Sequence, residues 1–142
     1  MADDTKRTAY TTAHIDDLPV EIDDDRPTTE WKPVRRFFGI GSFGTNIARA
    51  TQPGDVLNYD HTEIDDGGTR HEELFLIVSG HATYRVDGKE IDAPAGTFLY
   101  VPDPATVRGA VAREAGTTML AVGAEPGAVF TPSEWDTEPL PG

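Results

Sequence analysis

Short apolar segments alternate with turn-forming residues along most of this chain, and this alternation limits the folds that it can adopt. Turn signals stand at Pro53-Gly54, at 66–68, at Asp87-Gly88, at 94–96 and at 102–104. The segments between them are shorter than stable helices and rich in β-branched and aromatic residues. We therefore predict strands at 46–50, 56–64, 73–78, 81–86, 97–101, 106–112 and 117–122. The pattern favours an all-β fold.

Three segments carry more specific predictions. The run 74–78 has no polar face, so we expect a central strand that is covered on both sides. Asp87-Gly88 fits a two-residue type I′ hairpin turn, because glycine accepts a positive φ and aspartate tolerates it. Residues 34–43 combine apolar side chains with glycines, and we expect one or two opening strands there.

The composition excludes several classes of function. The chain has no cysteine, which rules out disulfides, thiolate nucleophiles and thiolate metal ligands. Its formal charge of -13 over 142 residues would repel a phosphate backbone, so we expect no nucleic-acid partner. No segment approaches the roughly 20 apolar residues of a membrane helix, and the first residues lack the features of a signal peptide. We therefore expect no membrane partner and a cytoplasmic location.

The chain is most simply organised as a single barrel domain with two appended segments. Residues 1–33 are polar, acidic and broken by prolines, which predicts an extended N-terminal arm that adds little to the core. The barrel is expected at 34–124, and a turn-rich C-terminal tail at 125–142 should pack on it. An arm of this kind can exchange between two subunits, so we expect a homodimer.

The segment HEELFLIVSGHATYRVDGKEIDAPAGTFLYVPDP, residues 71–104, resembles the conserved barrel of the cupin superfamily. The resemblance lies in a glutamate, an apolar run and a glycine in its first half, and in a Pro-x-Gly, a strand and a proline in its second half. Small single-domain bacterial cupins without an agreed activity are the most similar group. The resemblance implies a double-stranded β-helix, or jelly-roll barrel, and by itself implies no reaction.

Metal-binding cupins hold their ion with a His-x-His pair and a glutamate from a first motif and a histidine from a second. In this chain the resemblance puts Val107 where the second histidine belongs and Val111 where the family carries asparagine. One register, counted back from Glu73, leaves no histidine at the pair. Another, anchored on Pro53-Gly54, places His61 and Glu63 there and makes 65–70 a lengthened loop. We prefer the second register, because Asp-Asp-Gly-Gly is a turn sequence.

These residues leave two candidate functions open. A ligand pocket inside the barrel would be lined by Tyr59, His61, Glu63, His71, Glu73, Phe75, Val107 and Arg108, and would bind a small molecule without a metal cofactor. Alternatively, His61, Glu63 and Glu73 would hold manganese or iron in an enzyme of the oxygenase or isomerase type. No catalytic residue can be assigned in either case.

Arg108 bears directly on that choice. A guanidinium paired with Glu73 would replace a metal as the partner of this carboxylate. If Val107 and Val111 face the interior, as the resemblance implies, the alternation of a strand turns Arg108 outward instead. The sequence leaves both orientations open.

Overall fold

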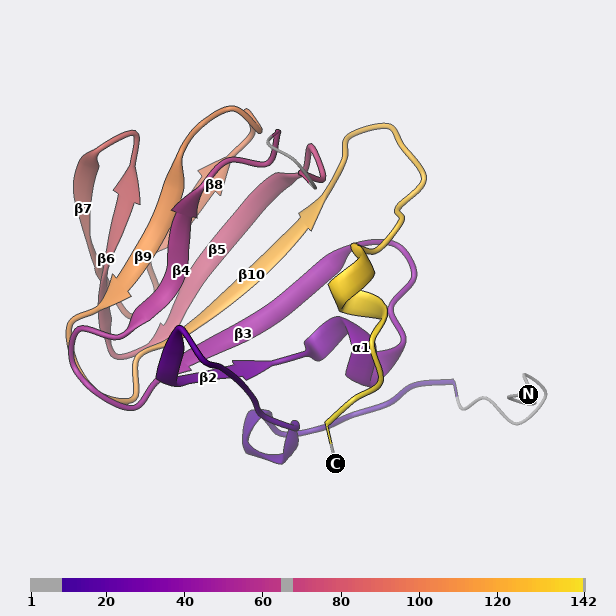
Figure 1. Ribbon diagram of the computed structural model, residues 1–142, viewed down its shortest axis with the longest axis horizontal. Coiled ribbons are helices and arrows are strands. Elements are labelled where there is room, and N and C mark those ends of the chain that lie inside the picture. Colours follow the sequence, from indigo (N-terminus) through magenta and orange to yellow (C-terminus); the bar gives the residue numbers. More distant parts are fainter. Residues whose placement is uncertain (1–8, 65–67, 142) are drawn as a thin grey trace.

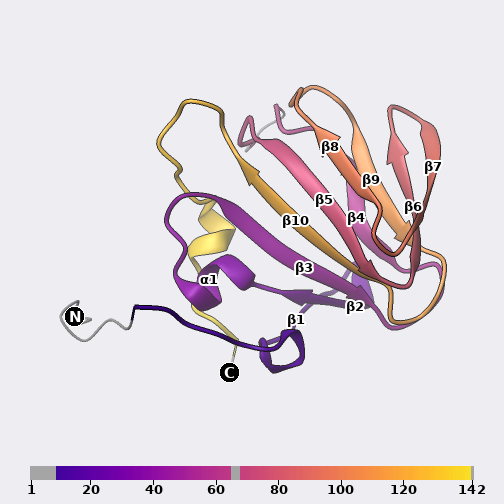
Figure 2. The ribbon, with the colours of Figure 1, turned by 180° about the vertical axis from the view of Figure 1, so that it is seen from behind.

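Two antiparallel sheets form the protein in a computed structural model that describes residues 9–64 and 68–141. The larger sheet has six strands, in the order β1 (Glu21–Asp23), β2 (Arg26–Lys32), β3 (Gly44–Ala50), β10 (Thr118–Ala124), β5 (Glu72–Ser79) and β8 (Phe98–Val101). The smaller has four strands, in the order β4 (Val56–His61), β9 (Arg108–Ala112), β6 (His81–Val86) and β7 (Lys89–Pro94). Figures 1 and 2, which view the protein from opposite sides, show the two sheets curving around a shared interior. The all-β prediction is confirmed.

Each predicted strand between residues 46 and 122 has a counterpart in these sheets, with ends shifted by a few residues. The type I′ prediction also agrees with the structure, since Asp87 and Gly88 have φ angles of 49° and 81°. This turn joins β6 to β7, a strand that the sequence analysis did not include.

The core fills the space between the sheets. Phe75 and Ile77 of β5 point into it and are almost fully buried, beside Leu57 of β4 and Tyr84 of β6. The opposite face of β5 is open, and its Leu74 and Val78 are 40% and 46% exposed. The prediction that residues 74–78 are covered on both faces is therefore wrong. The alternation of the strand buries only every second side chain against the smaller sheet.

Residues 34–38 are helical, which corrects the prediction of an opening strand. Helix α1 (Val34–Phe38) follows Pro33 and ends at Gly39, whose φ of 71° is the left-handed conformation that often terminates helices. Proline suits the start of a helix, because a first-turn amide has no acceptor within the helix. Two further short helical turns lie at η2 (Ile15–Asp17) and η3 (Glu134–Thr137). None of the helices in the described ranges is long and apolar enough to cross a membrane.

The N-terminal segment contributes more to the fold than expected. Strands β1 and β2 extend the six-stranded sheet, and Thr29 and Lys32 of β2 are buried. Among the described residues before 34, only Trp31 packs against the central apolar cluster, so this segment mainly extends the sheet through β2, which pairs with β3. Its Trp31 contacts Trp135 of η3 edge to face, with ring centroids 6.1 Å apart. The division into arm, barrel and tail as separable units stays a prediction.

Candidate functional site: a polar cavity inside the barrel

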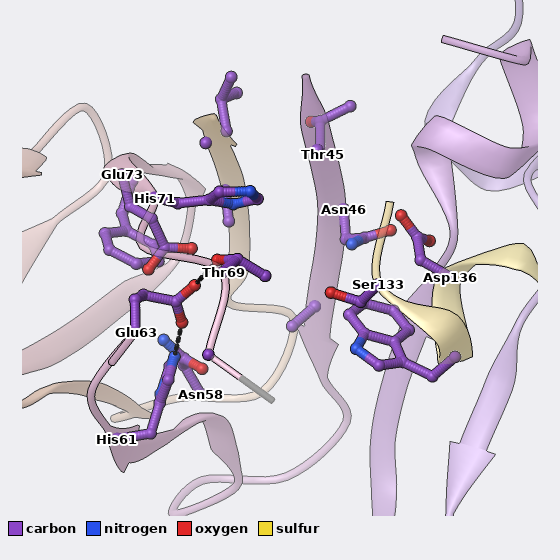
Figure 3. Close-up of a pocket in the computed structure, with 18 of the residues that line it drawn as sticks. Thr45, Asn46, Asn58, His61, Glu63, Thr69, His71, Glu73, Ser133 and Asp136 are labelled. Atoms are coloured by element: carbon purple, nitrogen blue, oxygen red, sulfur yellow. Dashed lines mark hydrogen bonds and ion pairs between the residues drawn. The ribbon is translucent and has the colours of Figure 1, made fainter. Parts of the chain in front are cut away.

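A cavity of about 420 Å³ opens between the sheets and beneath the C-terminal segment. Its inner wall comes from β4, β5 and the described residues between them, and includes His61, Glu63 and Glu73. Its outer wall comes from β3 and the segment around η3. Figure 3 shows these polar side chains on opposite sides of the open space.

The structure places the sequence-predicted site residues in two groups. His61, Glu63, His71, Glu73 and Phe75 line the cavity. The others, which do not line it, are Tyr59, Val107 and Arg108.

Tyr59 and Val107 both turn away from the interior. Tyr59 is 41% exposed and lies under the guanidinium of Arg26, 4.5 Å from ring centroid to Cζ. The pairing of β4 with β9 is irregular between Asn58 and His61. Such a bulge breaks the simple alternation that would have put Tyr59 and His61 on one face.

Arg108 points inward, and its side chain is fully buried. It shares this face of β9 with Ala110 and Ala112, which are also buried, whereas Val107 is 38% exposed. The resemblance placed Val107 facing the interior, and this alignment is therefore wrong by one residue. A shift of one residue exchanges the two faces of a strand. The second-motif position carries an arginine into the interior.

Arg108 and Glu73 form the buried ion pair of the site. Arg108 Nη1 donates to Glu73 Oε1 at 2.6 Å, while Nε and Nη2 donate to the backbone oxygens of Thr106 and Asp103 at 2.9 and 3.1 Å. Burial, reinforced by the nearby charge of Glu63, raises the pKa of Glu73 to about 7, although Arg108 opposes this shift. A pKa near 7 suits a general acid or base at neutral pH.

His61 and Glu63 form a second pair beside the first. His61 Nε2 lies 2.9 Å from Glu63 Oε2, and Nδ1 lies 2.7 Å from the Tyr59 backbone oxygen. The hydrogen bond with Glu63 raises the pKa of His61. Burial acts to raise the pKa of Glu63, but hydrogen bonds with His61 and Thr69 outweigh it and hold that pKa below its ordinary value. Both shifts favour the charged forms of His61 and Glu63, whereas the raised pKa of Glu73 favours its uncharged form.

His71 differs from His61 in its surroundings. Its ring lies 5.7 Å from the Phe130 ring, centroid to centroid, and burial lowers its pKa. At neutral pH it offers the cavity an uncharged imidazole that both donates and accepts hydrogen bonds.

His61, Glu63 and Glu73 could together hold a metal ion, because one ligand atom from each lies within 4.8 Å of the others. One imidazole nitrogen and two carboxylates suit manganese or iron. The donor types and their spacing therefore fit such an ion. However, the buried cation beside Glu73 is already Arg108, and its positive charge opposes a second cation at the same carboxylate.

The outer wall holds site residues that the sequence analysis missed. Asn46 of β3 and Asp136 of η3 line the cavity together with Trp31, Ser133 and Trp135. Asp136 is held by Arg35 of α1, whose Nε donates to Asp136 Oδ2 at 2.5 Å. The apolar and turn patterns gave no signal for this wall, because contacts between the two ends of the domain create it.

Comparison with known proteins identifies the family. A sequence model of the AraC-like ligand binding domain matches residues 57–140, which is more than half of the chain. Comparison with curated protein sequences gave no match.

Solved structures of cupins share the fold. A sugar phosphate isomerase from the cupin superfamily of Silicibacter pomeroyi superposes with a TM-score of 0.68 at 18% identity, over 81% of this chain and 76% of its own. A cupin protein from Bacteroides fragilis gives 0.62 at 15% identity, over 95% and 99%. A predicted oxalate decarboxylase from Thermotoga maritima gives 0.61 at 13% identity, over 81% and 99%. At these identities the likeness shows that the fold is that of cupin proteins, and the family match shows that this chain belongs to the AraC-like ligand binding domain family.

Proposed function

We propose that this protein binds a small organic molecule in the cavity between its two sheets and does so without a metal. The observation that carries the proposal is the buried Arg108–Glu73 pair at the cavity wall. Arg108 supplies, from the protein itself, the positive charge that a metal would bring to this carboxylate. The cavity volume and its mixture of polar and aromatic side chains are typical of small-molecule sites.

Filling the cavity tests this proposal. Ala121 lines it from β10, and Ala121→Phe would occupy the space where a ligand would sit. Val78→Phe is the matched control, since Val78 is exposed on the outer face of the neighbouring strand β5. Thermal shift against a panel of sugars, polyols, amino acids and organic acids should find a compound that stabilises the wild type and Val78→Phe but not Ala121→Phe. Equal shifts in all proteins, or none with any compound, would contradict the proposal.

The second candidate is a metal-dependent enzyme of the oxygenase or isomerase type, favoured by the convergence of His61, Glu63 and Glu73. His61, Glu63 and Glu73 would hold a manganese or iron ion there, and the ion would supply Lewis-acid or redox chemistry. Elemental analysis separates the candidates. Stoichiometric metal in protein purified without added metal, lost on His61→Ala, would establish the second candidate. No bound metal after reconstitution with Mn²⁺ or Fe²⁺ would remove it.

A homodimer and a cytoplasmic location belong to the proposal as well. The exposed apolar side chains of β5 and β8, which include Leu74, Val78 and Phe98, support self-association. Sedimentation velocity of the purified chain measures the oligomeric state directly, and a monomer at micromolar concentration would contradict the dimer.

A further inference from the structure

We propose that residues 125–135 form a strap across the mouth of the cavity, that this strap opens to admit a ligand, and that the ion pair of Asp136 with Arg35 holds it closed. The inference rests on the proposed ligand-binding function and adds how the cavity is reached. Figures 1 and 2 show the strap leaving the end of β10, turning back and returning through η3 beside α1. The end of β10 and Asp136 are therefore its two fixed points.

The strap lies between the cavity and a second hollow. This hollow measures about 390 Å³, and it shares lining residues with the cavity. The shared residues are Phe130, Ser133 and Trp135 of the strap and members of the stretch 68–71 across from it (Figure 3). Val129 lines only the second hollow and is 93% exposed, so this hollow faces the solvent. Displacement of the strap would join the two spaces and open the cavity.

Few contacts hold the strap between its ends. All residues from 124 to 135 are described, and none of them is buried. Among the described residues, the strap backbone hydrogen-bonds only to positions three residues away in the same segment and not to a sheet strand. Two ring contacts, Phe130 with His71 and Trp135 with Trp31, attach it to the barrel. Segments with so few buried side chains and backbone hydrogen bonds open locally without unfolding the domain.

The far end of the strap is fixed by charge. Arg35 of α1 donates from Nε to Asp136 Oδ2 at 2.5 Å and from Nη2 to the backbone oxygen of Asp136. Charge-assisted hydrogen bonds of this kind are stronger than neutral ones. The other carboxylate oxygen, Oδ1, lies 3.5 Å from Arg36 Nε, and neither buried atom has a hydrogen-bond partner in the described protein. Opening would let water bond to both atoms, which lowers the cost of releasing Asp136.

The near end of the strap has the features of a hinge. Glu125 and Ala128 close an exposed turn, in which Gly127 has a φ of 70°. Hinges are commonly a few residues at the end of an element that absorb a large change in backbone angles. When Asp136 is released, the strap can therefore rotate about 125–128 while β10 stays in its sheet.

Single cysteines report this opening without any ligand, because the chain has no cysteine of its own. Ala48 of β3 lines the cavity and is almost fully buried, so the thiol of Ala48→Cys should react when the strap opens. Ala82→Cys is the matched control, since Ala82 of β6 is fully buried outside the cavity lining. The probe is N-ethylmaleimide, which is uncharged, and intact-protein mass spectrometry measures its labelling rate.

Each cysteine is compared with itself in three backgrounds: unchanged, Asp136→Asn and Glu134→Gln. Asp136→Asn makes the acceptor neutral at constant shape and should raise the labelling rate of Ala48→Cys about tenfold. Glu134→Gln removes an exposed charge from the same turn and should leave this rate unchanged. Labelling of Ala82→Cys should change little in any background. An unchanged rate for Ala48→Cys in Asp136→Asn, or an equal rise at both cysteines, would overturn the inference.

A second measurement tests the strap if Asp136→Asn does not fold. With Asp136 unchanged, opening of the strap exposes far less surface than unfolding of the barrel. Labelling of Ala48→Cys should therefore depend weakly on low concentrations of urea, and labelling of Ala82→Cys should depend on them strongly. Equal urea dependence at the two cysteines would overturn the inference.

These outcomes separate the strap from the function on which it rests. Labelling detects the opening whether or not a compound binds. If the strap opens as expected and the panel of sugars, polyols, amino acids and organic acids yields no compound that binds, the ligand-binding function fails and the strap stands. If a compound binds in the cavity and the labelling of Ala48→Cys does not respond to Asp136→Asn, the function stands and the strap fails.

Discussion

Replacing Arg108 with methionine would leave the Glu73 carboxylate buried without its cation. Methionine keeps much of the apolar stem but has none of the donors that reach Glu73, Thr106 and Asp103 at 2.6 to 3.1 Å. The Arg108 side chain is fully buried and that of Glu73 is 15% exposed, so water cannot readily take the place of the guanidinium. Arg108→Met should therefore lower the free energy of unfolding of the domain.

The expected cost follows from breaking only one side of a buried pair. Removing one partner of such a pair costs about 3–5 kcal/mol, because the remaining charge is left uncompensated. Here part of that cost is relieved, since Glu73 can take up a proton near neutral pH. We therefore expect Arg108→Met to reduce the free energy of unfolding by about 3 kcal/mol at pH 8 and by less at pH 5.

A double-mutant cycle with Glu73→Gln isolates the interaction. Urea unfolding followed by tryptophan fluorescence measures each variant, and the double variant should be more stable than the sum of the single changes predicts. Arg113→Met is the matched control, because Arg113 pairs with Asp92 on the surface and both side chains are more than half exposed. If Arg108→Met costs no more than Arg113→Met, or if the two changes are additive, the buried pair does not stabilise the site as argued.

Two further predictions concern pH and a close backbone contact. Because burial raises the pKa of Glu73 from 4.5 to about 7, its stabilising proton is fully bound below pH 4.5 and lost as the pH rises through 7. The unfolding free energy of the wild type minus that of Glu73→Gln should therefore fall across this window, by up to about 1.4 kcal/mol per pH unit. If this difference did not change with pH between 4.5 and 7, the pKa of Glu73 would not be raised. Gly80→Ala should cost more than about 3 kcal/mol, or prevent folding, because an added Cβ would lie 2.4 Å from Thr117 Oγ1 and 2.6 Å from its Cα, at a φ of +83°. Gly88→Ala, at a φ of +81° with open space around it, should cost only about 1 kcal/mol, and equal melting temperatures for both variants would contradict the contact.

The sequence predicts well those features that neighbouring residues decide. The Asp87-Gly88 turn and the strand before it, β6, follow from local conformational preference, and the all-β prediction is confirmed. Strand β7 escaped notice because most of its side chains are exposed at the sheet edge and give no apolar signal. The helix at 34–38 was missed because its arginines bind Asp136 and Glu21, which lie elsewhere in the chain.

The candidate site was predicted only in part, for two physical reasons. His61, Glu63 and Glu73 lie together, as the preferred register predicted. That register could be chosen because Asp-Asp-Gly-Gly is a turn sequence and therefore separates the two strands. The orientation of Arg108 depends on the register of a single strand, and one residue decides it. The residues of the outer wall could not be predicted from the sequence, because Asn46 and Asp136 are far apart in the chain and line one cavity only in the folded protein.

The position of β10 constrains the order in which this domain can fold. It is the last strand in the chain, yet it lies between β3 and β5 and pairs with both. Without residues 118–124, the strand that joins β3 to β5 is missing, so the six-stranded sheet cannot be completed. Few of the stabilising pairings are local, which slows folding relative to helical domains of this size. We therefore expect β3 and β5 to keep unpaired edges until β10 has been synthesised, and unpaired strand edges of this kind favour aggregation and chaperone binding.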